Sequence, residues 1–296
     1  MKTLRHVLEY FFFQCTSAIL GLLPLQVAWK VGGSLGEFAY AGLGFRRTVI
    51  RENLRMAFPE LGEEDRERIA RGSFRNVGMS LMELMWLPRL TGQSVKSLVD
   101  FEGREVLEQC LRRGKGAVLL TAHIGNWEMV PISVQVALGI PVHSLYKPQS
   151  NPWIDRKIRA RRTKFGTRVI PMGMGIREIL RVLQSGECVL IAADQSAPKE
   201  SIRMKFFGRE VPVFQGPAVF CLKTGAAMVA SYCMRISDDS YKLEFKEIAT
   251  SDLSTGDDSV RELTRRHLEE TERVIRRYPD QWMWMHRRWK HSGEGE

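Results

Sequence analysis

The sequence predicts an α/β fold: a single domain with a largely parallel central sheet flanked by helices, preceded by an N-terminal hydrophobic helix that anchors it to a membrane. Between residues 116 and 195, short apolar runs alternate with stretches whose apolar residues recur at helical spacing. This alternation is typical of strands that run parallel in one sheet, with room for an antiparallel edge. The 296 residues are 44% hydrophobic and 26% charged, so the chain can bury one sizeable core.

The first element is the expected membrane segment, residues 1–45. Residues 10–29 read YFFFQCTSAILGLLPLQVAW and carry no formal charge. A helix of this length is about 30 Å long, enough to cross the hydrocarbon core of a bilayer. Pro24 would kink or end such a helix, so a re-entrant or interfacial insertion is one alternative, and a buried hairpin of core helices is the other.

The catalytic domain is expected to span residues 46–296, with its boundary near Arg46. Arginines cluster directly after the apolar segment, which favours the cytoplasmic face of the membrane for this domain. Just before the boundary, residues 32–36 read GGSLG and match the G-x-S-x-G pattern of hydrolase nucleophile elbows. They follow no predicted strand, so we interpret them as flexible membrane-proximal backbone.

Helices and strands then follow in order. A charged helix is expected over residues 61–87, where apolar residues recur at helical spacing. Strands are expected in the runs 116–122, 141–148, 167–172, 187–195, 228–236 and 241–248, the last two joined by a turn at SDDS. Helices are expected to start near residues 127, 152 and 175, and a final charged helix is expected over about 260–277.

Polar residues follow two of these strands. His123 follows the run 116–122, and Asp194 lies near the end of the run 187–195. In an open α/β sheet the reactive side chains gather at the carboxyl ends of the strands, because the loops there open onto a crevice. His123 and Asp194 are therefore the first candidates for a catalytic site.

A second acidic residue, Glu128, lies five positions after His123. Five helical steps of 100° would leave the two side chains about 140° apart, so a turn must separate them. Gly125 tolerates positive φ, and Asn126 is a good N-cap for a helix that begins at Trp127. This turn would bring the Glu128 carboxylate to Nδ1 of His123 and leave Nε2 free to act as a general base. The alternative is a histidine hydrogen-bonded at a strand end and a glutamate in the first turn of a helix; the spacing favours neither.

The net charge and the residue spacings limit which binding partners and cofactors the protein can have. The formal net charge of +10 indicates anionic partners: nucleic acid, a phospholipid surface, a phosphorylated substrate or an acidic carrier protein. The six histidines and five cysteines show no zinc-ligand spacing, and there is neither a P-loop nor a G-x-G-x-x-G after a strand. We therefore expect no metal and no cofactor.

The segment HIGNWE resembles the H-x4-D/E box of the lysophospholipid acyltransferase superfamily. The chain as a whole resembles the lipid A biosynthesis branch of that superfamily, the late (lauroyl/myristoyl) acyltransferases of Gram-negative bacteria. The further segments that carry the resemblance are RENLRMAFPEL, YKPQSNPWIDRKIRARR, IAADQSAP, FFG followed by GPAVF, and the closing YPDQWMWMHRRWK. One segment departs from the pattern, because DQSAP stands where the best-known members have D-H-D-Y-G.

This resemblance implies an O-acyltransferase that moves an acyl chain from acyl carrier protein, or acyl-CoA, to a hydroxyl of a phosphorylated lipid A precursor in lipopolysaccharide biosynthesis. His123 would be the general base and Glu128 its partner. Substrate binding is expected of Arg162, Asp194, Arg159, Asn126 and Gln195, with Arg161 close to the family's arginine position. The protein would act at the lipid surface of the bacterial inner membrane, with the catalytic domain at the cytoplasmic face and without binding nucleic acid.

Two alternatives stay open on the sequence. The first keeps the chemistry and changes the acceptor to a lysophospholipid or an aminolipid. The second is a non-catalytic basic protein that binds membranes or nucleic acid, although the chain lacks an RNA-binding or helix-turn-helix signature. In the same way, Phe206 and Phe207 fit an acyl channel or core packing, and the closing tryptophans Trp282, Trp284 and Trp289 fit an interfacial patch or a packed C-terminal segment.

Overall fold

A twisted sheet forms the centre of the protein in a computed structural model that describes residues 2–173, 175–237 and 240–292. Within these residues one seven-stranded sheet has the order β1-β9-β8-β2-β5-β3-β4. Its strands are β1 Val99–Glu102, β2 Ala117–Thr121, β3 Val142–Tyr146, β4 Arg168–Pro171, β5 Cys188–Ala192, β8 Ala227–Arg235 and β9 Tyr241–Ile248. Neighbouring strands pair in parallel except β8 and β9, so β1 and β9 run against the other strands. The predicted, largely parallel sheet with an antiparallel edge is confirmed.

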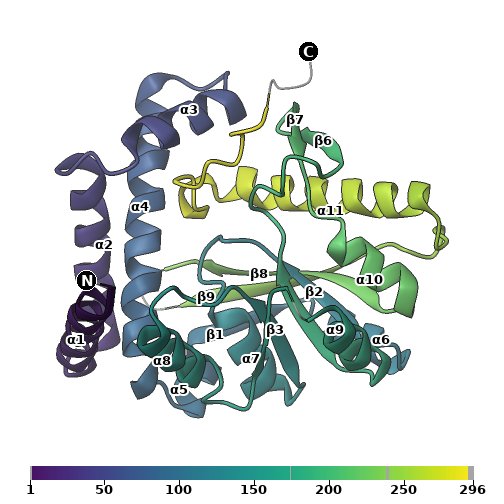
Figure 1. Ribbon diagram of the computed structural model, residues 1–296, viewed down its shortest axis with the longest axis horizontal. Coiled ribbons are helices and arrows are strands. Elements are labelled where there is room, and N and C mark those ends of the chain that lie inside the picture. The colour runs from purple at the N-terminus through teal and green to yellow at the C-terminus, as the bar shows by residue number, and fades with distance from the viewer. Residues whose placement is uncertain (1, 174, 238–239, 293–296) are drawn as a thin grey trace.

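Helices cover both faces of the sheet, as Figure 1 shows for α11 above it and α7 below it. The helices are α1 Lys2–Gly21, α2 Leu25–Ala41, α3 Arg47–Ala57, α4 Glu63–Trp86, α5 Gly92–Leu98, α6 Arg104–Arg112, α7 Met129–Leu138, α8 Pro152–Arg162, α9 Ile176–Gln184, α10 Gly216–Thr224 and α11 Asp257–Arg277, with short 3₁₀ turns η1 Leu87–Arg89 and η2 Pro279–Gln281. The central strand β2 is buried along its whole length. Val118 and Leu120 face the core under α9, α10 and α11, and Ala117 and Leu119 face the core under α5, α6 and α7.

The N-terminal apolar segment is not one continuous helix. It breaks at Pro24 into α1 and α2, which leaves two shorter helices. Of the helices in the described part of the chain, none is both long enough and apolar enough to cross a membrane. A membrane-spanning anchor therefore has no support in the structure.

Glycines bring α2 and α4 into close contact, and they explain the GGSLG motif. Gly32 and Gly36 lie inside α2 and face α4. A Cβ at Gly32 would lie 2.7 Å from the Gly78 carbonyl oxygen, and one at Gly36 would lie 2.1 Å from that of Phe74. Residues 32–36 are thus a helix face shaped for backbone-to-backbone packing, and their interpretation as flexible backbone is wrong.

The C-terminal tryptophans pack inside the protein. Trp282, Trp284 and Trp289 are 2%, 0% and 4% exposed and contact Phe206 and Phe207 of the hairpin β6 Arg203–Phe206 and β7 Arg209–Pro212. The interfacial aromatic patch is therefore wrong, and the packed C-terminal segment is correct. Phe206 and Phe207 are themselves buried, as core packing predicts.

The elements otherwise lie close to their predicted positions, with a few differences. Helix α7 begins at Met129, two residues later than predicted. The sequence patterns did not predict the short elements β1, α3, α5, α6 and α10 or the hairpin β6–β7. Residues 238–239 of the predicted SDDS turn lie outside the described residues, although the antiparallel pairing of β8 with β9 on either side is confirmed.

Candidate active site

The register of the sheet brings His123 and Asp194 together. Strands β2 and β5 are parallel neighbours, with Thr121 opposite Ala192. His123 and Asp194 each follow two residues after these partners, so both lie at the same carboxyl edge of the sheet. The predicted placement of both residues at strand ends is confirmed.

Asp194 is the carboxylate that contacts the imidazole. Its Oδ1 lies 2.8 Å from His123 Nδ1, and its Oδ2 accepts a hydrogen bond of 3.0 Å from the His123 backbone N–H. The indole Nε1 of Trp282 donates to the same Oδ2 at 2.8 Å. The Asp194 side chain is only 2% exposed. These three bonds fix the carboxylate and, through it, the orientation of the ring.

Glu128 does not contact Nδ1 of His123, so the predicted hydrogen bond between these two residues is wrong. Because Asp194 already occupies Nδ1, the Glu128 carboxylate points to α8 and forms a two-pronged ion pair with Arg162, with Arg162 Nε donating to Oε2 at 2.8 Å. Of the three neighbouring arginines named from the sequence, Arg162 is the one that meets Glu128. Arg159 is exposed and lies over the Tyr146 ring.

The charge and hydrogen bonds around Asp194 favour its ionised form, against the effect of burial. Burial alone would raise the pKa of its carboxyl, but the charge and hydrogen bonds of His123, with the Trp282 bond, outweigh burial and lower it below the usual range. Burial alone would lower the pKa of His123. The negative charge of Asp194 outweighs that effect, so the pKa of His123 lies above its ordinary value, with smaller opposing contributions from Glu128 and Arg162.

A sharp turn carries the chain from His123 to Glu128. Gly125 has φ +56°, and a Cβ there would lie 2.1 Å from the Cys233 carbonyl oxygen, so only glycine fits. Asn126 Oδ1 accepts from the Glu128 N–H at 3.1 Å, and α7 begins after Glu128. The expected N-cap at Asn126 is therefore wrong: Asn126 shapes the turn two residues before the actual N-cap, Glu128.

A buried ion pair holds the other end of the Asn126 side chain. Asn126 Nδ2 donates to Glu83 Oε2 at 2.6 Å, and Arg235 donates to both oxygens of Glu83 at 3.0 Å. Trp29 of α2 also donates its indole N–H to Glu83. This network ties the turn after β2 to α4, to the end of β8 and to the N-terminal hairpin.

The C-terminal segment pairs with the backbone of the same turn. Met283 N–H donates to the His123 carbonyl at 2.9 Å, and Gly125 N–H donates to that of Gln281 at 3.1 Å. Asn76 of α4 bridges the carbonyls of Gly125 and Gln281. Backbone groups of His123 and Gly125 are thereby held by residues distant in sequence.

The arrangement suits proton abstraction. An ionised Asp194 only accepts hydrogen bonds, so Nδ1 of His123 donates and Nε2 keeps its lone pair. Nε2 makes no hydrogen bond to the described residues, and the side chain is 24% exposed. Gln195, which follows Asp194, is half-buried and likewise has no hydrogen bond there. No group of three or more His, Cys, Asp or Glu among the described residues is suited to a metal ion.

One known protein family matches this chain over nearly its whole length. The profile of the family described as bacterial lipid A biosynthesis acyltransferase matches residues 1–291. The chain belongs to this family. The resemblance inferred from the motifs is thereby confirmed, and the protein is an acyltransferase.

Several acyltransferases are similar to this chain and align with it over most of their own length. The lipid A biosynthesis palmitoleoyltransferase of Escherichia coli (strain K12) is 28% identical over 93% of this chain and 88% of its own. The lipid A biosynthesis lauroyltransferase of the same strain is 24% identical over 92% of this chain and 88% of its own. A phosphatidylinositol mannoside acyltransferase of Mycolicibacterium smegmatis is also 24% identical, over 90% and 86%.

The sequence motifs did not identify two parts of the site in this acyltransferase. Trp282 is expected only in an interfacial patch or a packed C-terminal segment, although its hydrogen bond to Asp194 makes it part of the site. Glu83 and Arg235 lie in segments where nothing distinguishes them from solvated charges. A signal existed for Glu83, because it falls on the apolar stripe of α4 and not on the charged face.

Proposed function

We propose that this acyltransferase moves a fatty acyl chain from an acyl carrier protein thioester to a hydroxyl of a phosphorylated lipid A precursor at the cytoplasmic face of the inner membrane. The observation that carries the chemistry is the His123–Asp194 hydrogen bond, which leaves Nε2 as a free base. Relatives named for lipid A biosynthesis support the acceptor. The basic chain suits both an acidic carrier and a phosphorylated glycolipid.

His123 acts as the general base. Nε2 removes the proton from the acceptor hydroxyl while that oxygen attacks the thioester carbonyl, and Asp194 stabilises the resulting imidazolium. The C–O bond forms as the carbonyl oxygen becomes an oxyanion. When the intermediate collapses, the C–S bond breaks and the leaving thiol takes the proton back from His123. No covalent acyl-enzyme is needed.

Arg162 and Glu128 act beside the imidazole. Two-pronged pairing holds the Arg162 guanidinium rigid, and both charges are close enough to affect the pKa of His123. In this proposal Arg162 supplies positive potential to the oxyanion, and Glu128 fixes the direction of the guanidinium. Asn126 positions Glu128 through the turn, and the exposed Arg159 and the half-buried Gln195 contact substrate at the rim.

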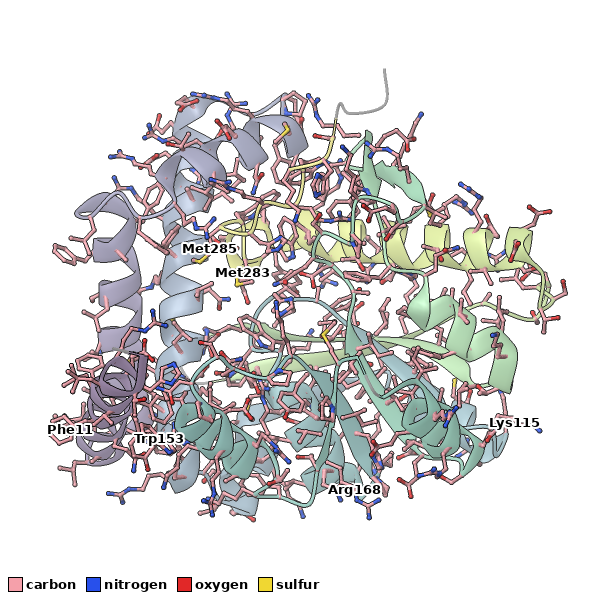
Figure 2. The ribbon with its side chains drawn as sticks, viewed as in Figure 1. Phe11, Lys115, Trp153, Arg168, Met283 and Met285 are labelled. Atoms are coloured by element: carbon pink, nitrogen blue, oxygen red, sulfur yellow. The ribbon has the colours of Figure 1, made fainter. Side chains whose placement is uncertain are left out.

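Membrane attachment is proposed through α1 and α2. Their outer faces and the turns that follow each helix expose large apolar side chains; the most exposed are Leu4, Phe11, Phe12, Ile19, Leu22 and Leu43, each at least 62% exposed. Such a surface fits helices that lie in the bilayer interface with the apolar side buried. Figure 2 shows Phe11 of α1 and Trp153 of α8 at the same outer edge of the protein. Residues 1–45 then form the interfacial segment and residues 46–296 the catalytic domain.

A transfer assay tests the function. Purified protein in mixed micelles, supplied with acyl carrier protein charged with lauroyl, myristoyl or palmitoleoyl chains, should acylate a tetra-acylated lipid A precursor, with the product weighed by mass spectrometry. His123→Ala should lose activity by at least about a hundredfold, since general base catalysis contributes that much or more. Undiminished transfer by this variant would remove the proposed base.

A second acceptor has one specific observation in its favour. The phosphatidylinositol mannoside acyltransferase is as similar to this chain as the lauroyltransferase is. The same assay with a phosphatidylinositol mannoside, and with a lysophospholipid, therefore accompanies the first. Preferential acylation of either would move the proposal to that acceptor and keep the mechanism.

A further inference from the structure

A basic cavity lies on the side of α8 that turns away from the His123 site. It has a volume of about 550 Å³ and lies between α1, the C-terminal end of α4 with η1, and α8. Figure 1 shows α1, α4 and α8 together at this corner of the protein. The cationic residues that line it are Arg89, Lys157, Arg161 and Lys164, and the lining includes no Asp or Glu.

Arg161 is the deepest of these cations and has no counter-charge. It is 7% exposed, and its guanidinium donates to the Leu84 carbonyl at 3.1 Å and to Ser17 Oγ at 2.5 Å, which are both neutral. No carboxylate of the described residues lies within ion-pair distance of it. Burying a charge without a partner is unfavourable, so an anion in the cavity would supply the missing charge.

Lys164 is more exposed than Arg161, but its hydrogen-bond partners are likewise neutral. Its ammonium donates to the carbonyls of Pro88 and Leu90 at 2.7 and 2.6 Å, and burial lowers its pKa without any acidic residue to oppose the effect. Burial alone likewise lowers the pKa of Arg161 to about 10. Arg162, the next residue on α8, is instead paired with Glu128. The helix thus presents a neutralised arginine to the catalytic site and uncompensated cations to the cavity.

The cavity borders the apolar surface of α1. Gln14, Ser17, Ala18 and Gly21 of α1 line it, and Phe11 of this helix and Leu22 directly after it are 67% and 78% exposed. A ligand here would meet cations and exposed hydrocarbon together. That combination matches a lipid with an anionic head group better than a soluble anion.

We propose that this cavity binds the phosphate group of a membrane lipid, whose acyl chains lie along the exposed face of α1. The proposal rests on the membrane association proposed above and is independent of the chemistry at His123. The phosphate belongs either to a bulk phospholipid, which would orient the enzyme on the membrane, or to the acceptor glycolipid, which would be held while its hydroxyl meets His123.

The test compares two double variants of equal charge. Arg89→Gln with Lys157→Gln removes two lining cations whose side chains make no hydrogen bond within the described residues, which protects the fold. Lys30→Gln with Arg156→Gln removes two exposed cations from α2 and α8 that do not line the cavity. Thermal unfolding without ligand checks that both remain folded.

Binding is measured by flotation with phosphatidylcholine vesicles, with and without phosphatidic acid. A cation near a membrane contributes about 1 kcal/mol, or about fivefold in affinity, so two charges account for at most roughly 30-fold in the control. The cavity variant should lose at least about a further tenfold on vesicles that contain phosphatidic acid. Inorganic phosphate should also raise the unfolding temperature of the wild type and the control, and not that of the cavity variant.

The result also identifies the source of the phosphate. A higher KM for the lipid A precursor at unchanged kcat in neutral-detergent micelles assigns it to the acceptor, whereas an unchanged KM with weaker vesicle binding assigns it to bulk phospholipid. Equal behaviour of the two double variants in every measurement would overturn the proposal. If the wild type does not bind phosphatidylcholine vesicles at all, membrane association is refuted. The phosphate titration would still test the cavity.

Discussion

Replacement of Asp194 by asparagine is the most direct test of the catalytic geometry. The asparagine side chain has nearly the shape of aspartate but carries one acceptor and one donor. If its oxygen keeps the bonds from Trp282 and the His123 backbone N–H, its NH₂ faces Nδ1 of His123. Nδ1 must then accept, which places the proton on Nε2 and removes the lone pair that the reaction needs.

The size of the effect follows from this tautomer change. The same substitution in a Ser-His-Asp triad lowers kcat by about 10⁴, so a loss of about 10³ to 10⁴ is expected here. The pH dependence should change as well. Asp194 raises the pKa of His123, so without its charge the acidic limb of kcat/KM should move to lower pH in the residual activity.

The assay is the pH profile of acyl transfer by the wild type, Asp194→Asn and Trp282→Phe. The tryptophan variant removes one hydrogen bond to Asp194 and leaves the contact with Nδ1, so it should lose only about tenfold to a hundredfold, the value of one hydrogen bond to a charged group. Activity of Asp194→Asn within threefold of wild type, with an unmoved acidic limb, would refute the role of Asp194.

Four further predictions follow from contacts already described. Arg162→Lys keeps the charge but loses the two-pronged pairing with Glu128, so kcat should fall about tenfold with little change in unfolding temperature, measured by transfer assay and thermal unfolding. Glu83→Gln leaves a buried arginine unpaired and should lower the free energy of unfolding by about 3–5 kcal/mol in urea titration. Gly78→Ala places a Cβ 2.1 Å from a carbonyl of α2 and should lower that free energy by about 1–3 kcal/mol; an equally stable variant would contradict the close packing. Burial lowers the pKa of His267 to about 4, so the unfolded chain takes up its proton first as pH falls below 6.5; stability should drop by about 2 kcal/mol from pH 7 to 5, and His267→Gln should reduce that drop.

The sequence predicted where the site residues lie in the fold better than it predicted their contacts with one another. Buried strands of four or five residues can be recognised in the sequence as apolar runs, and His123 and Asp194 follow shortly after two of them. Their contact depends on β2 and β5 being neighbours in register, which is a property of the whole sheet. The spacing of His123 and Glu128 allowed a contact, but the nearer carboxylate came from another strand.

Other features could not be predicted, because short motifs do not reveal what packs against them. GGSLG is equally consistent with mobile backbone and with a tight helix contact until α4 is placed beside it. Tryptophans near arginines suit a membrane interface as well as a core. In this protein the tryptophans fill the space under the β6–β7 hairpin, where they are only a few per cent exposed.

The pairing of the C-terminal segment with the loop after β2 has a consequence for biosynthesis. A nascent chain that has emerged through β9 already contains His123 and Asp194. It still lacks Trp282 and the backbone of Gln281 and Met283, which hold the carboxylate and the imidazole loop. Until residues 281–283 have been synthesised, the chain therefore has the candidate base without the contacts that align it.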